Sequence, residues 1–102
     1  MDYDIDAPEA WAVTTGSSSI TVAVIDDGCE AHPDMEDGFG NSRILSGFTP
    51  HLTLTSAVPL NSGDGHGQCV AGIIGASHNT IGVKGIAPAV TILPVFVRLD
   101  LS

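Results

Sequence analysis

His66 and Asp26 are the two side chains whose types and positions best suit acid-base chemistry. Histidine has an ordinary pKa of about 6.5, which suits proton transfer at neutral pH. His66 falls where a helix is expected to begin, and the helix macrodipole disfavours the imidazolium ion there. A histidine that accepts a proton in such a place needs a carboxylate partner. Asp26 follows an apolar run and can supply one, which favours a functional pair over an isolated surface histidine.

The helix expected to begin at His66 is indicated by the spacing of apolar residues. Val70, Ile73 and Ile74 stand three and four positions apart, which places them on one face of a helix. Asp64 is a favourable N-cap just before this segment. The segment also contains three glycines: Gly67, Gly72 and Gly75. Glycine costs about 1 kcal/mol relative to alanine inside a helix, so these glycines predict close approach of another backbone or a ligand.

An earlier helix is predicted near the N-terminus. Asp6 is its expected N-cap, Pro8 lies in its first turn, and Glu9 follows the cap by three residues, which is the spacing of a capping box. Trp11 and Val13 would then give it a packing face. A polar loop separates this helix from the first strand.

Three apolar segments predict the strands of the fold. Residues 20–25 are β-branched and apolar, residues 43–48 form a plausible short strand, and residues 91–97 form another, with Pro94 as an unfavourable feature. The polar segment between the second strand and His66 is predicted to be a surface loop. This order of elements implies an α/β fold with a parallel sheet flanked by helices, in which functional residues gather at the carboxyl ends of strands.

Composition excludes several classes of function. The 102 residues carry a formal charge of −9 with only three Lys and Arg, which argues against a nucleic-acid or anionic-membrane surface and suits metal ions or basic substrates. No apolar run is long enough to span a bilayer, and no signal peptide follows Met1. Cys29 and Cys69 are too few for a disulfide framework; their pairing stays open, and we expect two small buried apolar residues.

Three sequence blocks resemble the N-terminal part of the catalytic domain of subtilisin-like serine proteases, the subtilases. Residues 22–28, followed by His32-Pro33-Asp34, resemble the aspartate motif of that family. Residues 66–72 resemble its H-G-T-H-V-A-G histidine motif, and residues 79–88 resemble the N-x-I-G-V-x-G-V-A-P segment that follows it. The resemblance implies a subtilisin-like α/β fold, with residues 1–102 as the N-terminal portion of a single, incomplete catalytic domain.

The resemblance implies a serine endopeptidase that uses an Asp-His-Ser triad on polypeptide substrates. Asp26 would orient and support His66, and His66 would take the proton from the serine that attacks a peptide carbonyl. The serine of this family lies in a G-T-S-x-A motif, and no serine of the chain has that context. We therefore expect the serine downstream, no peptidase activity from these residues without the remainder of the catalytic domain, and secretion of the parent protein, as is usual in the family.

The resemblance also implies a structural calcium site. The matching positions are the carboxylate of Asp34, the side chain of Asn79, and the main-chain oxygens of Ser77, Ile81 and Val83. Oxygen ligands from a glycine-containing loop suit a hard cation such as calcium.

The chain departs from the family pattern at three positions. Gln68 and Cys69 replace the threonine and second histidine of the histidine motif, and Gln68 is expected to alter the packing beneath His66. Asp27 stands where many subtilases have threonine or serine. Its Asp-Asp-Gly context resembles the kexin-like branch, which predicts that Asp27 contacts a basic residue of the substrate.

Two alternatives come from different classes of protein. Cys29-x-x-His32 and His66-x-x-Cys69 have the spacing of zinc-ligand pairs, which would make the chain a small non-enzymatic metal-binding module. A receiver domain also carries paired acids after its first strand, but Asp64 and Lys84 do not follow the apolar strands that such a domain needs. The first alternative remains open and the second is set aside.

Overall fold

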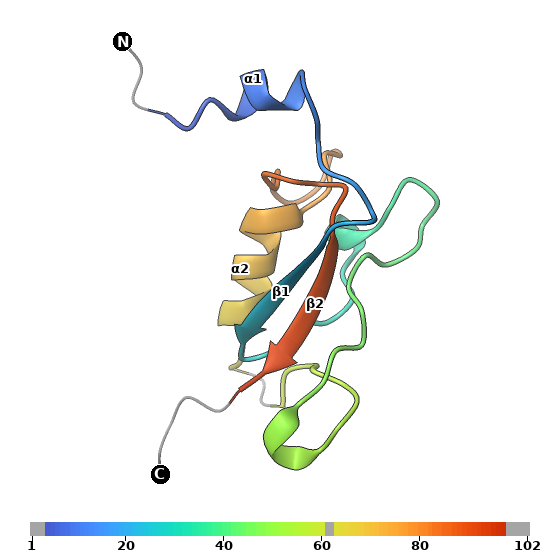
Figure 1. Cartoon of the computed structure of the whole chain (residues 1–102), viewed down its shortest axis with the longest axis vertical. Coiled ribbons are helices and arrows are strands. Elements are labelled where there is room, and N and C mark those ends of the chain that lie inside the picture. The colour runs from blue at the N-terminus through green and yellow to red at the C-terminus, as the bar shows by residue number, and fades with distance from the viewer. Residues whose placement is uncertain (1–3, 61–62, 98–102) are drawn as a thin grey trace.

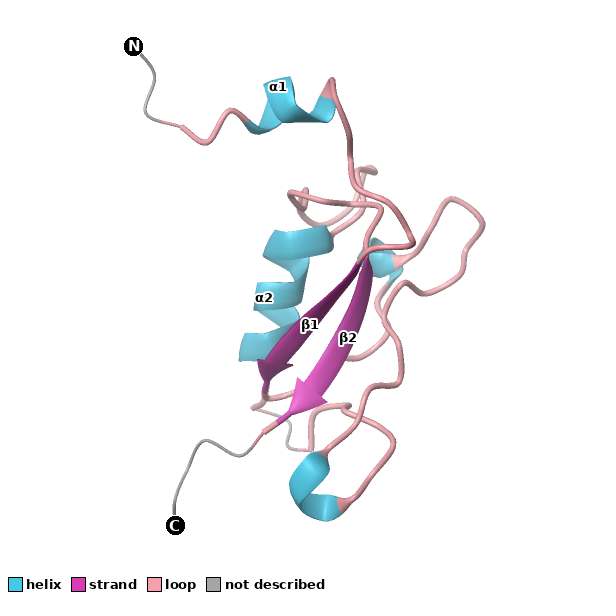
Figure 2. Ribbon diagram, viewed as in Figure 1, coloured by secondary structure: helices cyan, strands magenta, loops and turns pink. Residues whose placement is uncertain are grey.

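The computed structural model describes residues 4–60 and 63–97 of the chain. Two parallel strands, β1 (Thr21–Asp26) and β2 (Thr91–Phe96), lie side by side, with Thr21 opposite Thr91 and Asp26 opposite Phe96. Helix α2 (His66–Gly75) covers one face of this pair (Figure 1), and irregular segments surround them (Figure 2). The predicted α/β class with a parallel sheet and helices is confirmed.

The predicted strand at residues 43–48 is wrong as a regular strand. Within the described residues this segment runs along the outer edge of β2 and makes isolated bridges from Ile44 to Ile92 and from Phe48 to Val95. Gly47 has a φ of +68°, and a Cβ there would overlap the carbonyl oxygen of Pro94. Pro94 has no N–H with which to continue a ladder on this edge. The segment therefore bends where regular pairing would have continued, which also explains why β2 tolerates a proline.

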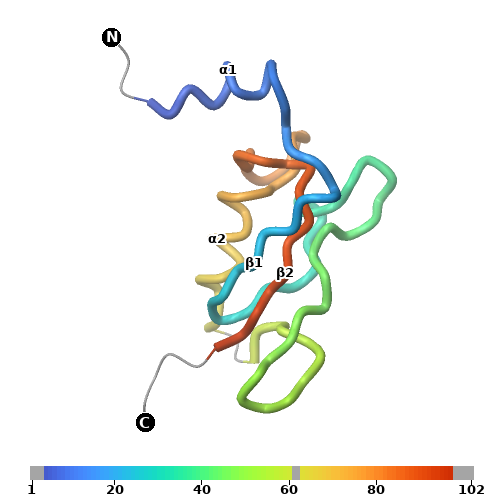
Figure 3. The backbone as a smooth tube through the Cα atoms, in the orientation of Figure 1, coloured from blue at the N-terminus to red at the C-terminus, as the bar shows by residue number. Residues whose placement is uncertain are grey.

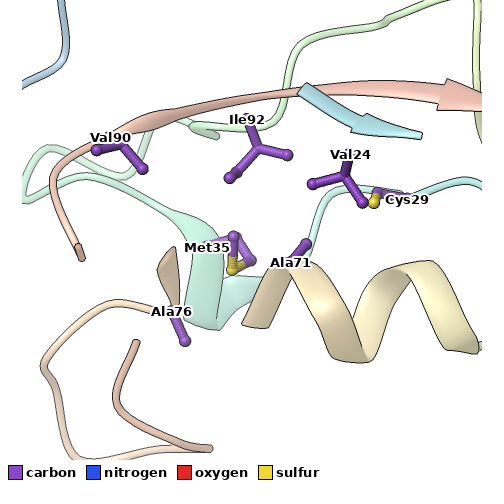
Figure 4. Packing of buried hydrophobic residues seen from close by; sticks show 7 residues of the cluster. All are labelled: Val24, Cys29, Met35, Ala71, Ala76, Val90 and Ile92. Atoms are coloured by element: carbon purple, nitrogen blue, oxygen red, sulfur yellow. The ribbon is translucent and has the colours of Figure 1, made fainter. Parts of the chain in front are cut away.

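The core between α2 and the sheet is made mainly of small and medium-sized side chains. Figure 4 shows its seven buried members: Val24, Cys29, Met35, Ala71, Ala76, Val90 and Ile92. The predicted apolar face of α2 is partly wrong, because Ile73 is 67% exposed while Gly67, Ala71 and Gly75 are buried. A Cβ on Gly67 would lie 2.5 Å from the carbonyl oxygen of Gly28. Small residues therefore bring the first turn of α2 close to the end of β1.

The first helix, α1 (Ala7–Trp11), is present but is not capped as predicted. Asp6 occupies the N-cap position with a φ of +56°, in the left-handed region, and its side chain makes no capping hydrogen bond. No residue of α1 is buried, and Val13 is 86% exposed. The helix contacts the remainder of the chain through Trp11, whose Nε1 donates to the carbonyl oxygen of Ile86 at 2.8 Å. α1 lies apart from the sheet (Figure 3) and takes no part in placing Asp26 and His66.

The two other short helical segments lie in connections. They are the 3-10 turns η1 (Pro33–Met35), after β1, and η2 (Pro50–Leu52), within the long segment predicted as a loop. Over residues 4–60 and 63–97, no helix has the length and apolar character that crossing a bilayer requires.

Candidate active site

The structure brings Asp26 and His66 together at the carboxyl end of the sheet. Asp26 is the last residue of β1 and His66 is the first residue of α2. His66 Nδ1 and Asp26 Oδ2 are 2.7 Å apart, within hydrogen-bond distance. The Asp26 side chain is 12% exposed and the His66 side chain is 75% exposed. The pair is therefore a largely buried carboxylate that holds an imidazole facing outward.

Asp26 is held in its charged form by its hydrogen bonds. Burial, the largest single influence, raises the pKa of Asp26, but its hydrogen bonds from the Asp27 backbone and from His66 outweigh burial and lower the pKa below its usual value. The Asp27 N–H donates to Asp26 Oδ1 at 2.7 Å. An ionised carboxylate only accepts hydrogen bonds, so Nδ1 of His66 carries the proton. Nε2 is then the nitrogen of the ring that can accept a proton.

Asp27 binds the backbone at the beginning of α2. Its Oδ1 accepts from the Gly67 N–H at 2.6 Å and its Oδ2 accepts from the His66 N–H at 3.3 Å. The predicted N-cap, Asp64, is wrong, because Gly65 occupies that position and has no side chain with which to cap the helix. The carboxylate that binds the first turn comes instead from the residue that follows β1. No local signal in the sequence indicates this role for Asp27, because it reaches the helix from 39 positions away.

The predicted calcium ligands lie in a loop that folds around Asp34. The Ser77 N–H donates to the Asp34 backbone carbonyl at 2.7 Å, and the Val83 N–H donates to Asp34 Oδ2 at 2.9 Å. Asn79 Oδ1 accepts from the Ile81 N–H at 3.0 Å. Within the described part of the chain, the buried Asp34 Oδ1 has no hydrogen-bond partner. A buried carboxylate oxygen without a partner is costly, and a hard cation would satisfy it.

Comparison with known proteins identifies the family. A family model described as the Subtilase family matches residues 17–102. The chain belongs to the subtilase family.

Two curated subtilase relatives show how much of such a protein this chain represents. Minor extracellular protease Epr of Bacillus subtilis (strain 168) is 37% identical over 91 residues, which cover 89% of this chain and 13% of that protein. Subtilisin Savinase of Lederbergia lenta is 38% identical over 91 residues, which cover 89% of this chain and 30% of that protein. The subtilase chain described here thus spans less than a third of the length of either relative.

A solved structure gives the same result at the level of the fold. The crystal structure of the Aeromonas sobria serine protease (ASP), in complex with the chaperone ORF2, matches this subtilase chain with a TM-score of 0.68 and 32% sequence identity. The match covers 86% of this chain and 14% of that chain. The paired strands and the helix that carries His66 therefore belong to a subtilisin-like fold.

Gln68, one of the departures from the subtilase pattern, has a structural partner that the sequence did not predict. Its Oε1 accepts from the Glu30 N–H at 2.8 Å, and its Nε2 donates to the Glu30 carbonyl at 3.1 Å. The Cys29 thiol also reaches this turn and donates to the Gly67 carbonyl at 3.4 Å. The first turn of α2 in this subtilase is therefore bound to the segment that follows β1 at several points.

The zinc site of the alternative interpretation is not formed in this subtilase chain. Cys29 and Cys69 are free thiols, and His66 Nδ1 is occupied by Asp26. Among residues 4–60 and 63–97, no group of three or more His, Cys, Asp and Glu side chains is placed to hold a metal ion. The expectation that both cysteines are buried is half wrong: Cys29 is buried, but Cys69 is exposed. Burial, reinforced by the charges of Asp26 and Asp27, raises the pKa of Cys29 to about 11.

Proposed function

We propose that the protein is a subtilisin-like serine endopeptidase in which Asp26 and His66 are the acid and the base of an Asp-His-Ser triad. The observation that carries the proposal is the 2.7 Å contact between Asp26 Oδ2 and His66 Nδ1, made at the junction of β1 and α2 in a chain of this family. The Bacillus subtilis relative is called an extracellular protease and the solved structure is of a serine protease, which supports the same activity here.

The geometry supports a definite division of roles. Asp26 accepts a hydrogen bond from the Nδ1–H group and fixes the imidazole, so Nε2 takes the proton from the nucleophilic serine as that serine attacks a peptide carbonyl. The same nitrogen then protonates the leaving amine, and Asp26 stabilises the imidazolium formed in between. In this proposal the serine comes from downstream of residue 102, and residues 1–102 alone have no peptidase activity. The greater length of the relatives leaves room for such a segment.

The experiment is a peptide-cleavage assay on the protein as its gene encodes it. We expect His66→Ala and Asp26→Asn to lower kcat by about 10⁴-fold or more, a magnitude known for serine proteases that include subtilisin. His78→Ala is the matched control, because His78 contacts Trp11 and the Gly85 carbonyl at the far end of α2 and should keep wild-type kcat. Wild-type cleavage that persists in His66→Ala would contradict the proposal, as would turnover by residues 1–102 alone.

We also propose that calcium binds between Asp34 and the loop of residues 77–83. Asp34 and Asn79 would supply side-chain oxygens, and Ser77, Ile81 and Val83 would supply main-chain oxygens. The buried, unpartnered Asp34 Oδ1 supports this site. Bound calcium would supply positive charge that links the loop to η1, and it takes no part in the peptidase chemistry.

Thermal unfolding tests the calcium site. Calcium at about 100 times its Kd should stabilise the folded protein by roughly 3 kcal/mol, and EDTA should reverse the gain. Asp34→Asn should remove the response, whereas Asp37→Asn, a change in an exposed turn, should keep it. Equal unfolding temperatures in calcium and in EDTA would contradict the site.

We propose that the protein acts outside the cell. The relative from Bacillus subtilis is named an extracellular protease, and that name is the support for the proposal. Detection of the protein in the culture medium, rather than in the cell pellet, is the test.

A further inference from the structure

We propose that Asp27 is a positioning residue, whose carboxylate fixes the backbone at the beginning of α2 and thereby holds the His66 ring against Asp26. The inference rests on the proposed function, because it explains how the base of the triad is kept in place. It differs from the sequence prediction, which assigns Asp27 to contact with a basic residue of the substrate.

The contacts of Asp27 satisfy two groups that the helix itself cannot satisfy. The first N–H groups of a helix have no intrahelical acceptor, and a negative charge near them is favourable. Asp27 accepts from two of them, on His66 at 3.3 Å and on Gly67 at 2.6 Å. Gly65, at the N-cap position, has no side chain with which to do so. Asp27 therefore replaces a local N-cap from 39 positions earlier in the chain.

Two consecutive residues of the sequence hold His66 at two different atoms. Asp26 binds the ring at Nδ1, while Asp27 binds the backbone N–H of the same residue. The two residues are also linked, because the backbone N–H of Asp27 donates to Asp26 Oδ1. A shift of the helix start relative to β1 would move the ring away from Asp26, even though Asp26 itself stayed in place. A displacement of about 1 Å of a catalytic group can lower the rate by about 100-fold.

The position of the Asp27 carboxylate favours this role over substrate contact. Each of its oxygens already accepts a backbone hydrogen bond, and the side chain is partly buried beneath the first turn of α2. A Cβ added to Gly67 would lie 3.0 Å from Asp27 Oδ1, which shows how closely the helix backbone sits on the carboxylate.

The experiment measures kcat and KM of the gene-encoded protein on two peptides that differ only in a basic or a neutral residue before the cleaved bond. Asp27→Ala removes both acceptors, so we expect kcat to fall by about 10- to 100-fold equally on both peptides, with KM unchanged. Asp27→Asn keeps one acceptor oxygen, and asparagine caps helices as well as aspartate does, so it should restore most of kcat. A selective rise in KM for the basic peptide in Asp27→Asn would overturn the proposal in favour of substrate contact.

A matched control distinguishes the loss of positioning from the general effect of removing a carboxylate that binds backbone N–H groups. Asp37 also accepts two backbone N–H groups, from Phe39 at 2.7 Å and from Asn41 at 3.0 Å, but in a turn outside the paired residues. Asp37→Ala should keep wild-type kcat. If Asp27→Ala does not fold, Asp27→Asn and Asp27→Ser replace it. The side chain of Asp27→Ser is shorter and reaches less far. Positioning is supported if Asp27→Asn has the kcat of the wild type while Asp27→Ser has a lower kcat on both peptides.

The proton on His66 Nδ1 gives a readout that does not need substrate. In a hydrogen bond to Asp26 it should give a strongly deshielded proton resonance, which Asp27→Ala should weaken or shift while Asp37→Ala leaves it in place. If the wild-type protein cleaves no peptide but the resonance depends on Asp27, the proposed function fails and the positioning role stands. An unchanged resonance and unchanged kcat in folded Asp27→Ala would overturn the positioning role alone.

Discussion

Helix α2 is bound at its two ends by side chains of opposite charge that differ in burial. At the N-terminal end the partly buried carboxylate of Asp27 accepts from two backbone N–H groups. At the C-terminal end the guanidinium of Arg43, only 7% exposed, donates to the Gly75 carbonyl at 2.6 Å and to Ser77 Oγ at 2.7 Å. Both charges complement the macrodipole of the helix.

The difference between these ends separates stability from chemistry. Arg43 also donates to the Val90 carbonyl at 2.8 Å, so it joins the end of α2 to the beginning of β2 inside the core. The Asp27 carboxylate binds the first turn, and that turn carries the exposed His66 ring. We infer that the C-terminal end holds the helix in the fold and the N-terminal end sets the position of the His66 ring. A change at each end should therefore affect a different measurement.

The largest expected effect is at the C-terminal end. Arg43→Ala would leave the buried Gly75 and Val90 carbonyls without a donor, at a cost of about 1–3 kcal/mol for each such group. We expect the free energy of unfolding in urea to fall by about 4 kcal/mol, and by less in Arg43→Lys, which keeps a charged donor. If Arg43→Ala lowered the free energy of unfolding by less than about 1 kcal/mol, the C-terminal end of α2 would not hold the helix in the fold as inferred.

A single methyl group tests the close contact at the N-terminal end. Helix propensity alone predicts that Gly67→Ala stabilises the protein by up to about 1 kcal/mol. The structure predicts the opposite sign, a loss of about 2 kcal/mol with lower kcat, because the new Cβ would lie 2.5 Å from the Gly28 carbonyl oxygen. Gly72→Ala is the matched control, since its Cβ would meet only Val83 Cγ2 at 3.8 Å, and it should be neutral or stabilising. Similar unfolding curves for the two variants would contradict the prediction.

Local patterns in the sequence were sufficient for β1, β2 and the start of α2. A few neighbouring positions are enough to distinguish a strand, by its β-branched residues, from a helix, by the spacing of its apolar residues. In parallel sheets functional residues gather at the carboxyl ends of strands, and this rule places Asp26 near the start of the next helix. The predicted strand at residues 43–48 failed because its outcome depends on Gly47 against Pro94, a contact between two distant segments.

The groups that hold α2 could not be predicted for the same reason. Asp27 reaches the His66 backbone across 39 positions, Gln68 reaches Glu30 across 38, and Arg43 reaches Gly75 across 32. Nothing in the neighbourhood of each residue distinguishes these contacts from ordinary solvated side chains. Asp64 and Asp6 were predicted as caps because the local rule considers only the adjacent side chain, whereas the tertiary fold supplied the cap of α2 from Asp27, the residue after β1.

Acid should weaken the N-terminal end of α2 before it affects the Arg43 contacts, which stay charged. Because hydrogen bonds to the carboxylate lower the pKa of Asp26 in the folded state, the stability that they give is present above the unfolded pKa of about 4 and is lost as the pH falls through the folded value. We expect the difference in unfolding free energy between wild type and Asp26→Asn to shrink from pH 6 to pH 2. A difference that is constant over this range would mean that Asp26 gains no stability from its partners.

The smallest expected effect is on the rates at which the two thiols are alkylated. These rates report opening of the first turn of α2 and need no activity measurement. Cys69 is exposed, whereas Cys29 is buried, donates to the Gly67 carbonyl, and has a pKa raised to about 11, so only about one Cys29 in a thousand is a thiolate at pH 8. Iodoacetamide should therefore label Cys69 first, as peptide mass spectrometry can follow, and label Cys29 only as the turn opens. Because Asp27 binds that turn, Asp27→Ala should speed the labelling of Cys29 and leave that of Cys69 unchanged. Equal labelling rates of the two cysteines in the native protein would mean that the N-terminal end of α2 is not closed over Cys29.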